Sequence, residues 1–232
     1  MVEYTGNSGC TNMRMRKKKW AQPWLEAHTD YIDPDPVKYR GKWKDLLQKN
    51  ILHLEIGMGK GDYLIGMSQL YPDEGWVGME KDPSAAAVAA RKQVESGHDL
   101  SNNHMIVGDA EKLLNWFDRK EVDVIHLNFS DPWPKKHYHK RRLSSEKFLQ
   151  MYRYILNDQG KILMKTDNKD LFEDSVLYFL QNGFTLTEFS VDYRRKEHPE
   201  DVITEYESKF MAEGLPIYRL CAVIDERSGE KQ

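Results

Sequence analysis

Short apolar segments alternate with amphipathic ones along most of this chain, and this alternation limits the folds that it can adopt. Residues 51–56 form a short apolar run that ends in glycines, as expected for a buried strand. Residues 62–70 then carry apolar side chains at helical spacing until Tyr71 and Pro72 end the helix. The same order recurs: strands are expected at 51–56, 76–79, 104–107, 122–128 and 160–166, and helices at 62–70, 84–96, 110–117, 146–156 and 168–183. Repeated strand–helix units predict a parallel sheet with helices on both faces.

The C-terminal part departs from this order. Residues 185–191 and 217–224 have the pattern of two strands, without a clear helix between them. Such a hairpin-like pair is expected to add one antiparallel strand to the otherwise parallel sheet. The predicted fold is therefore α/β, with a mixed and mostly parallel sheet.

The composition fits a single folded domain. With 232 residues and 40% hydrophobic content, the chain can bury one good-sized core. A run of about 18 apolar residues, which a membrane span needs, is not found, and neither is a secretory signal. Cys10 and Cys221 form no disulfide framework and no metal-ligand spacing, which suits a reducing cytosol. We expect a disordered polar leader at residues 1–12 with Met13 as an alternative natural start, a basic N-terminal arm at 13–40 and the main domain at 41–226.

Basic residues gather locally although the formal net charge is −3. Runs lie at residues 14–19, 135–142 and 194–196. Each run taken singly fits an ordinary solvated surface, because exposed Lys and Arg are the norm. Phosphate contacts are local, however, so three such runs on a near-neutral body can form a nucleic-acid footprint.

A glycine loop follows the first predicted strand of this alternation. Gly57, Gly59 and Gly61 connect strand to helix, where a missing side chain lets the backbone turn sharply and approach a ligand. Dinucleotides and S-adenosylmethionine both bind at this position of such sheets. The dinucleotide pattern requires a sixth-place glycine, where this chain has Asp62, an acid that would repel a pyrophosphate. Glu55 before the loop instead suits a cofactor with an ammonium group and a cationic sulfonium. A plain tight turn is the structural alternative.

Two more acids follow the next two strands. Glu80 ends the second strand, where a carboxylate can accept hydrogen bonds from both ribose hydroxyls. Asp109 follows the third strand, where it can receive an adenine amino group or simply cap the next helix. Three successive strand ends with Glu55, Glu80 and Asp109 favour a nucleoside-containing cofactor more strongly than any one of them.

The end of the fourth strand carries a rigid loop. Pro132 and Pro134 fix the backbone around Trp133, and Asp131 stands at the mouth of the crevice. The loop runs directly into the basic residues 135–142. A carboxylate beside a concentrated cationic patch suits a site that brings a polyanion to a methyl donor.

At these residues the chain resembles the bacterial tRNA (guanine-N7-)-methyltransferases. The matching segments occur in the family's order at 54–61, 128–142, 165–168 and 204–207, and the resemblance covers about residues 14–222. The proline–tryptophan–proline segment with its basic tail is specific to the family, whereas the glycine loop is shared with many methyltransferases. The resemblance implies a seven-stranded, Rossmann-like class I methyltransferase fold that transfers a methyl group from S-adenosylmethionine to N7 of the variable-loop guanine of tRNA, position 46 in tRNA numbering.

The resemblance also implies roles for individual residues. The cofactor positions are Glu55, Gly57, Gly59, Glu80, Asp109 and Asp131, and Asp131 also matches the catalytic position. The substrate positions are Lys135, Asp167, Thr204, Glu205, Tyr206 and Glu207. The RNA-contacting positions are His137, Tyr138, His139, Lys140, Arg141 and Arg142. The acid at the second strand is Glu where the family has Asp, which keeps the ribose-binding chemistry.

The chemistry of N7 methylation limits what these residues need to do. Guanine N7 has a free lone pair and no proton, so alignment matters more than a general base. Asp131 or Asp167 can stabilise the positive charge that develops on the purine, or hold the base. Trp133 and Tyr206 are candidates for stacking on an exposed base, although Trp133 fits equally well as a packed side chain.

Other polar residues fit a structural role. His53 and His126 lie in strand patterns and are expected to be buried and hydrogen-bonded, and Cys221 to be a small core residue. No constellation suggests a metal site. The residues 14–20 are expected to be flexible and to clamp RNA.

Three other functions compete with this one. A nucleotide-dependent oxidoreductase would explain the glycine loop and Glu80, but Asp62 and the basic loop count against it. DNA adenine or cytosine methyltransferases carry a similar acid–proline–aromatic motif, but there a second proline follows the first, where this chain has Trp133. An inactive RNA-binding module is disfavoured by the intact acids. We expect tRNA as the partner, no membrane, no metal, no obligate partner subunit, a monomer or homodimer, and a cytoplasmic location.

Overall fold

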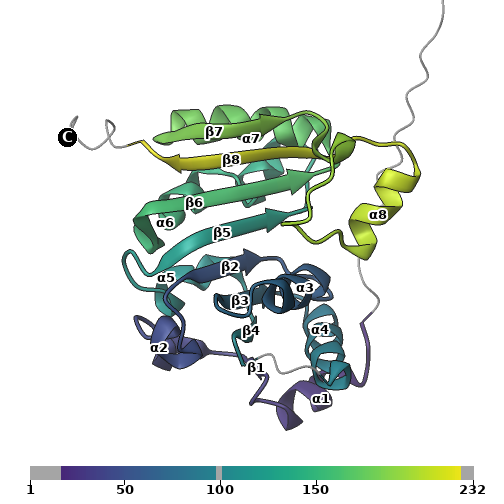
Figure 1. Cartoon of the computed structure of the whole chain (residues 1–232). Helices are drawn as coiled ribbons and strands as arrows, with labels where there is room; N and C mark the ends of the chain where they lie inside the picture. Colours follow the sequence, from purple (N-terminus) through teal and green to yellow (C-terminus); the bar gives the residue numbers. More distant parts are fainter. Residues whose placement is uncertain (1–16, 98–100, 226–232) are drawn as a thin grey trace, which may run out of the picture.

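One sheet organises the computed structural model, which describes residues 17–97 and 101–225 (Figure 1). The leader predicted at 1–12 lies outside these residues. Within them the sheet has eight strands in the order β1-β4-β3-β2-β5-β6-β8-β7. Their bounds are β1 Ile32–Asp33, β2 Leu52–Ile56, β3 Gly75–Glu80, β4 Asn103–Val107, β5 Val122–Asn128, β6 Leu156–Thr166, β7 Phe184–Ser190 and β8 Tyr218–Ile224.

Strand directions confirm the predicted mixed sheet. The strands β1, β4, β3, β2, β5 and β6 pair in parallel, whereas β8 runs antiparallel to both β6 and β7. The count differs, because eight strands are present among the described residues where seven were expected. The additional strand, β1, is only two residues long and pairs with β4 through Ile32 and Met105. It is too short to produce an alternating pattern in the sequence.

Helices follow most of the strands, as the alternation predicts. Their bounds are α1 Ala21–Ala27, α2 Trp43–Leu47, α3 Asp62–Leu70, α4 Pro83–Ser96, α5 Leu113–Trp116, α6 Glu146–Ile155, α7 Lys169–Gln181 and α8 Glu205–Ala212, with 3-10 turns η1 Pro36–Tyr39, η2 Ala110–Lys112, η3 Lys136–Arg141 and η4 Tyr193–Arg195. Helix α8 lies between β7 and β8, where no clear helix was expected, so that expectation was wrong.

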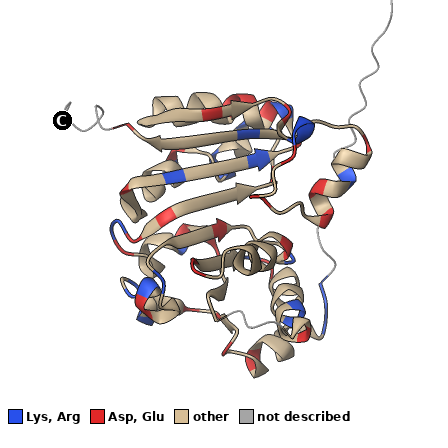
Figure 2. Ribbon diagram, in the orientation of Figure 1, with Lys and Arg blue, Asp and Glu red and all other residues tan. Residues whose placement is uncertain are grey.

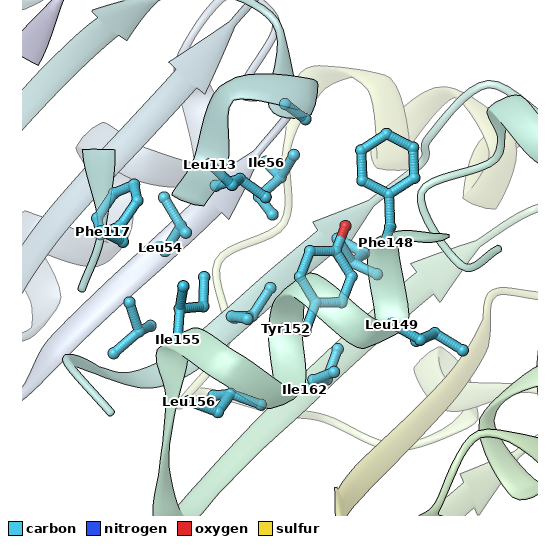
Figure 3. Close-up of a cluster of buried hydrophobic side chains, with 14 of the residues drawn as sticks. Leu54, Ile56, Leu113, Phe117, Phe148, Leu149, Tyr152, Ile155, Leu156 and Ile162 are labelled. Atoms are coloured by element: carbon cyan, nitrogen blue, oxygen red, sulfur yellow. The ribbon is translucent and has the colours of Figure 1, made fainter. Parts of the chain in front are cut away.

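Alternating side chains divide the sheet into two faces. On β2, Leu52, Leu54 and Ile56 join a core with residues of α5, α6 and α7, whereas His53 and Glu55 point to the other face. Figure 3 shows part of this core, in which aromatic and aliphatic side chains of α6 fill the space against the strands.

The opposite face of β2, β3 and β4 is covered by α1, α3 and α4. Close approach depends on small residues, because a Cβ at Gly61 would lie 2.9 Å from the Cβ of Ala89 on α4. Of the arm predicted at 13–40, α1 packs here: Leu25 is buried, and the Lys18 N–H donates to Ser84 Oγ of α4 at 2.9 Å.

Polar side chains occupy the same face on the neighbouring strands β5, β6 and β8. Figure 2 shows basic residues on β6 and β8 at this part of the sheet. His126, Lys165 and Arg219 are all buried there. Tyr63 of α3 and the segment from η4 to α8 pack over them through hydrogen bonds and ion pairs rather than apolar contacts.

Candidate active site

The glycine loop bends the chain back over β3 at the carboxyl edge of the sheet. Gly57, Gly59 and Gly61 adopt φ angles of 83°, 55° and 77°, a left-handed region that favours glycine. The N–H groups of Gly57 and Met58 both donate to the Met79 carbonyl, at 2.9 and 3.0 Å. The loop is therefore a fixed turn that leaves its outer side open to a ligand.

Glu55 is a buried carboxylate with one unsatisfied oxygen. Asn128 Nδ2 donates to its Oε1 at 3.1 Å, while Oε2 has no hydrogen bond of normal geometry among the described residues, although the backbone N–H of Leu64 also acts on this carboxylate. Burial raises the pKa of Glu55 to about 7, against the smaller opposing effect of the Asn128 hydrogen bond. A buried acceptor without a donor is costly for a folded protein, so Oε2 is suited to a cationic or N–H donor supplied by a ligand.

Glu80 and Asp109 make different contacts. Glu80 Oε2 accepts from the Gly59 N–H at 3.0 Å and Oε1 from the Asp82 N–H at 2.8 Å, so this side chain joins the glycine loop to the start of α4. Burial raises the pKa of Glu80. Asp109 is exposed and caps η2 by accepting from the Glu111 N–H at 2.9 Å. Each carboxylate oxygen has a second lone pair, so these contacts leave room for ribose or adenine donors.

Strand order brings the predicted acids together. On the adjacent strands β4, β3, β2 and β5, the polar residues Asp109, Glu80, Glu55 and Asn128 all lie at the carboxyl edge. Glu80 and Asn128 end their strands, Glu55 is the last but one residue of β2, and Asp109 follows β4 by two residues. In sheets of this class the crevice beyond the carboxyl ends of the strands is where ligands bind.

The loop after β5 is held in an uncommon backbone conformation. Phe129 and Trp133 have φ angles of 51° and 42° although neither is glycine, and the Phe129 N–H donates to the Lys165 carbonyl at 2.8 Å. Asp131 lies exposed between them. Backbone strain of this kind persists only where the surroundings enforce it.

Trp133 is half-buried, so it is neither a core side chain nor a free one. Its ring meets Tyr138 edge-on at 5.9 Å between centroids. The guanidinium of Arg141 lies 5.1 Å from the ring centroid, and Lys81 Nζ lies 5.8 Å from it. These cation–π contacts stabilise the loop against the basic turn η3.

Arg142, predicted to contact RNA, is placed inside the protein instead. Its side chain is 2% exposed. Its Nε donates to the Pro132 carbonyl at 2.7 Å, and its Nη1 pairs with Asp174 of α7 at 2.5 Å. Arg142 therefore links the proline loop to α7 from the inside of the protein. Of the other predicted RNA contacts, Tyr138 and His139 are half-buried, and the exposed ones are His137, Lys140 and Arg141.

The predicted substrate segment begins α8. Thr204 caps the helix by accepting from the Glu207 N–H at 3.1 Å, and Glu205 is exposed. Tyr206 is 42% exposed, and its ring lies 5.3 Å from Phe129 and 4.7 Å from Phe210 between centroids. The helix thus presents an aromatic side chain beside the loop that carries Asp131.

Glu207 does not face this site, since it is 0% exposed. Its Oε1 pairs with Arg194 Nε at 2.6 Å and its Oε2 with Lys165 Nζ at 3.2 Å. Asp201 pairs with the same two cations, with Lys165 at 2.6 Å. Burial acts to raise the pKa of Asp201, but Lys165 and Arg194 outweigh it and hold that pKa below its usual value. We name these four residues the ion cluster.

Two neutral histidines extend the ion cluster across the sheet. Tyr63 Oη donates to Asp201 Oδ1 at 2.8 Å and lies 3.2 Å from His126 Nδ1, while His126 Nε2 lies 2.9 Å from His53 Nδ1. Burial lowers the pKa of His53 to about 3 and that of His126 well below its usual value. Because the Tyr63 proton goes to Asp201, the contact between Tyr63 Oη and His126 Nδ1 needs the proton on His126 Nδ1. His53 lies between His126 and Glu74, whose Oε2 is 2.8 Å from His53 Nε2. The expectation of buried, hydrogen-bonded histidines is confirmed.

Comparisons with known proteins decide the family. The sequence pattern of the family described as "Putative methyltransferase" matches residues 49–220. The chain is 44% identical to the tRNA (guanine-N(7)-)-methyltransferase of Limosilactobacillus reuteri (strain DSM 20016) over 212 residues, which cover 90% of this chain and 99% of that protein. It is 43% identical to the protein of the same name from Geobacillus kaustophilus (strain HTA426), covering 91% and 97%. The chain belongs to the tRNA (guanine-N7-)-methyltransferase family.

Solved structures support the fold at lower identity. The 16S rRNA methyltransferase KamB superposes with a TM-score of 0.61 at 14% identity, covering 80% of this chain and 93% of its own length. A SAM dependent methyltransferase from Aquifex aeolicus superposes with a TM-score of 0.54 at 12% identity, covering 88% and 98%. Membership of the tRNA (guanine-N7-)-methyltransferase family and this fold leave no place for the oxidoreductase alternative.

Sequence reasoning did not give a role to several residues that shape this methyltransferase site. Asn128 and Lys165 lay within recognised segments but had no assigned contact, and Arg194 was taken only as part of a basic run. Tyr63 and Asp201 carried no signal of their own. Asp167 follows β6 as a half-buried acid, and burial raises its pKa. Separately, no group of metal-binding side chains occurs among the described residues.

The ion cluster predicts that Glu207 stabilises the fold of this methyltransferase. Changing Glu207→Gln leaves two buried cations facing one carboxylate, so the free energy of unfolding should fall by about 3–5 kcal/mol. Urea denaturation measures this change.

Glu205→Gln is the matched control, because Glu205 lies on the same helix but is exposed and forms a surface pair with Lys209. It should leave the unfolding midpoint nearly unchanged. Equal stability of Glu207→Gln and the wild type would contradict the structural role of Glu207.

Proposed function

We propose that this chain transfers a methyl group from S-adenosylmethionine to N7 of a guanine in tRNA, and that this guanine lies in the variable loop. The observation that carries the proposal is the unsatisfied Oε2 of Glu55 beside the glycine loop, at the same sheet edge as Asp131. Family membership supports the reaction type, since the relatives at 43% and 44% identity carry that activity in their names.

The donor set at the carboxyl edge fits S-adenosylmethionine. Glu55 Oε2 offers an acceptor to the ammonium group of the methionyl part. Gly57 and Gly59 let the backbone approach it closely. Glu80 accepts from the ribose hydroxyls, and Asp109 from the adenine amino group. Asp131, the remaining predicted cofactor residue, lies near the methyl end.

Alignment and charge stabilisation are the tasks of the protein in the reaction. S-adenosylmethionine supplies a methyl group bound to a sulfonium. As N7 forms its bond to the methyl carbon, the carbon–sulfur bond breaks and its electrons stay on sulfur, so the positive charge moves to the purine. Asp131 stabilises that developing charge, and Asp167, one strand away, holds the base through its amino and imino hydrogens. No proton has to leave N7, so neither acid acts as a base there.

The target base stacks on the exposed face of Tyr206. The Tyr206 ring contacts Phe129, which precedes Asp131 by two residues in the same loop. The aromatic surface of Tyr206 therefore lies beside the loop that carries the acid. Stacking of an extruded base on an aromatic side chain contributes about 1–3 kcal/mol. Thr204 and Glu205 at the start of α8 offer polar contacts, and Lys135 offers a cation to a neighbouring phosphate. Glu207 acts from within by holding the helix in place.

The RNA backbone binds along the basic loop and η3. The outward members of this surface are Lys135, Lys136, His137, Lys140 and Arg141, with Tyr138 and His139 beneath them. Arg142 fixes the loop from inside. Local cations of this kind bind phosphates even though the net charge of the chain is −3.

We further propose a cytoplasmic enzyme that acts as a monomer or homodimer without an obligate partner subunit. No helix in residues 17–97 or 101–225 is long and apolar enough to cross a membrane. We also propose that residues 14–20 clamp the RNA, as the sequence predicts.

The reaction is tested with labelled S-adenosylmethionine and tRNA transcripts. A transcript with a variable-loop guanine should accept one methyl group, and a transcript in which only that guanine is changed should accept none. Equal labelling of both transcripts would overturn the assignment of the variable-loop guanine as the target. Labelling of neither transcript would overturn the proposed methyl transfer to tRNA.

The charge role of Asp131 predicts a loss of turnover. Asp131→Asn keeps the shape but removes the negative charge, so kcat at saturating substrates should fall by roughly 100-fold, as for other removed electrostatic stabilisers. Asp170→Asn, another exposed acid at the carboxyl edge, is the control and should keep full turnover. Near wild-type turnover of Asp131→Asn would show that the carboxylate charge plays no part.

Binding of S-adenosylhomocysteine should weaken as the pH falls. Only ionised Glu55 attracts the ammonium group, and its pKa in the empty site is about 7. From pH 7.5 to pH 6.0 its ionised fraction falls from about three quarters to about one tenth, so the Kd should rise roughly eightfold. Calorimetric titration measures this.

Glu55→Gln should bind more weakly and lose this pH dependence, whereas Glu95→Gln on the exposed side of α4 should behave as the wild type. A full pH dependence in Glu55→Gln would mean that another group titrates.

A further inference from the structure

A second basic site lies beyond the candidate active site, where β7 and β8 meet the turn η4. The turn η4 follows β7, and the Tyr193 N–H donates to the Ile217 carbonyl at 2.7 Å, which fixes this turn beside β8. A cavity of about 210 Å³ opens there, and Phe189, Tyr193, Arg195, Lys196, His198 and Arg219 are among its lining residues. Figure 2 shows the basic residues of this turn at the same end of the sheet as the ends of β5 and β6.

The three consecutive basic residues at this turn, 194–196, lie in different surroundings. Arg194 points inward and is neutralised in the ion cluster. Arg195 and Lys196 line the cavity, are exposed, and form no ion pair with any described residue. Two cations held side by side without a counter-charge are suited to an anion from outside the protein.

The remaining charges of the cavity are already satisfied. Arg219 Nε pairs with Glu188 at 3.2 Å, and its guanidinium lies 4.5 Å from the centroid of the Tyr193 ring. The His198 ring stacks on Tyr193 at 3.8 Å between centroids, and its Nδ1 lies 2.7 Å from Glu200. Glu188 is thus balanced by Arg219, and the positive charge of Arg195 and Lys196 is what a ligand meets.

The position of the cavity matches the substrate of the proposed reaction. From β5, which carries the Asp131 loop, the strands β6, β8 and β7 follow in order, so the cavity lies three strand spacings away. At about 4.8 Å per strand this is roughly 14 Å. Four stacking steps of about 3.4 Å each span that distance, so one RNA strand of about five nucleotides can reach from the reacting base to the cavity.

We propose that this cavity binds a backbone phosphate of tRNA through Arg195 and Lys196, on the side of the active site opposite to the glycine loop. The proposal rests on the proposed function, because it takes tRNA as the substrate. Phe189, which is 57% exposed, provides an apolar wall for the adjoining ribose. The basic loop after β5 and this cavity would then hold the RNA on two sides of the target guanine.

The test measures binding of a tRNA transcript at several salt concentrations. The double variant Arg195→Ala/Lys196→Ala should raise the Kd for tRNA by roughly tenfold and lower the slope of log Kd against log salt by about 1, the value for one lost phosphate contact. Affinity for S-adenosylhomocysteine and the unfolding temperature should not change. Arg195→Lys/Lys196→Arg should restore the salt slope, because it retains both charges.

The control is Lys42→Ala/Arg119→Ala, which removes one lysine and one arginine that are exposed near the amino edge of the sheet. It should leave tRNA binding unchanged. If the first double variant does not fold, Lys196→Gln alone should still raise the Kd for tRNA and lower the salt slope, by less than the double variant. A salt slope equal to that of the wild type would overturn the phosphate site, whereas a wild-type protein that neither binds nor methylates tRNA would overturn the proposed function instead.

Discussion

Pairing of buried charges governs how this chain closes over its sheet. Lys165 and Arg194 are both buried, and burial of a cation is tolerated only when an anion compensates it. The compensating carboxylates, Asp201 and Glu207, lie on the segment that leads from η4 into α8. This segment must therefore return across β6, and its return is what brings Tyr206 against Phe129 beside the Asp131 loop.

Most of the sheet could be predicted from the sequence, because its strands follow the simplest physical pattern. Central strands such as β2 and β5 are short apolar runs between turn residues, and their order along the chain implies parallel pairing. Helix α8 escaped prediction for a specific reason. Its one buried residue is the charged Glu207, and its aromatic residues Tyr206 and Phe210 stay partly exposed, so it has no buried apolar stripe by which a helix is recognised.

The site was predictable in its residue types but not in its orientations. Acids at the strand ends follow from topology, since parallel strands bring their carboxyl ends to one edge. Arg142 and Glu207 look like surface residues of a binding motif, yet both are buried because Asp174 and Lys165 pair with them. Those partners lie 32 and 42 positions along the chain, a separation at which sequence pattern gives no information.

The shortness of α8 has a consequence for how the enzyme forms. Isolated helices of eight residues are unstable in water, because nucleation costs more than so few hydrogen bonds return. The helix exists only once Glu207 has met its two cations, one on β6 and one on η4. The surface that carries Tyr206 is therefore stable only together with the sheet that supplies these cations, whereas the cofactor edge on β2 and β3 does not depend on α8.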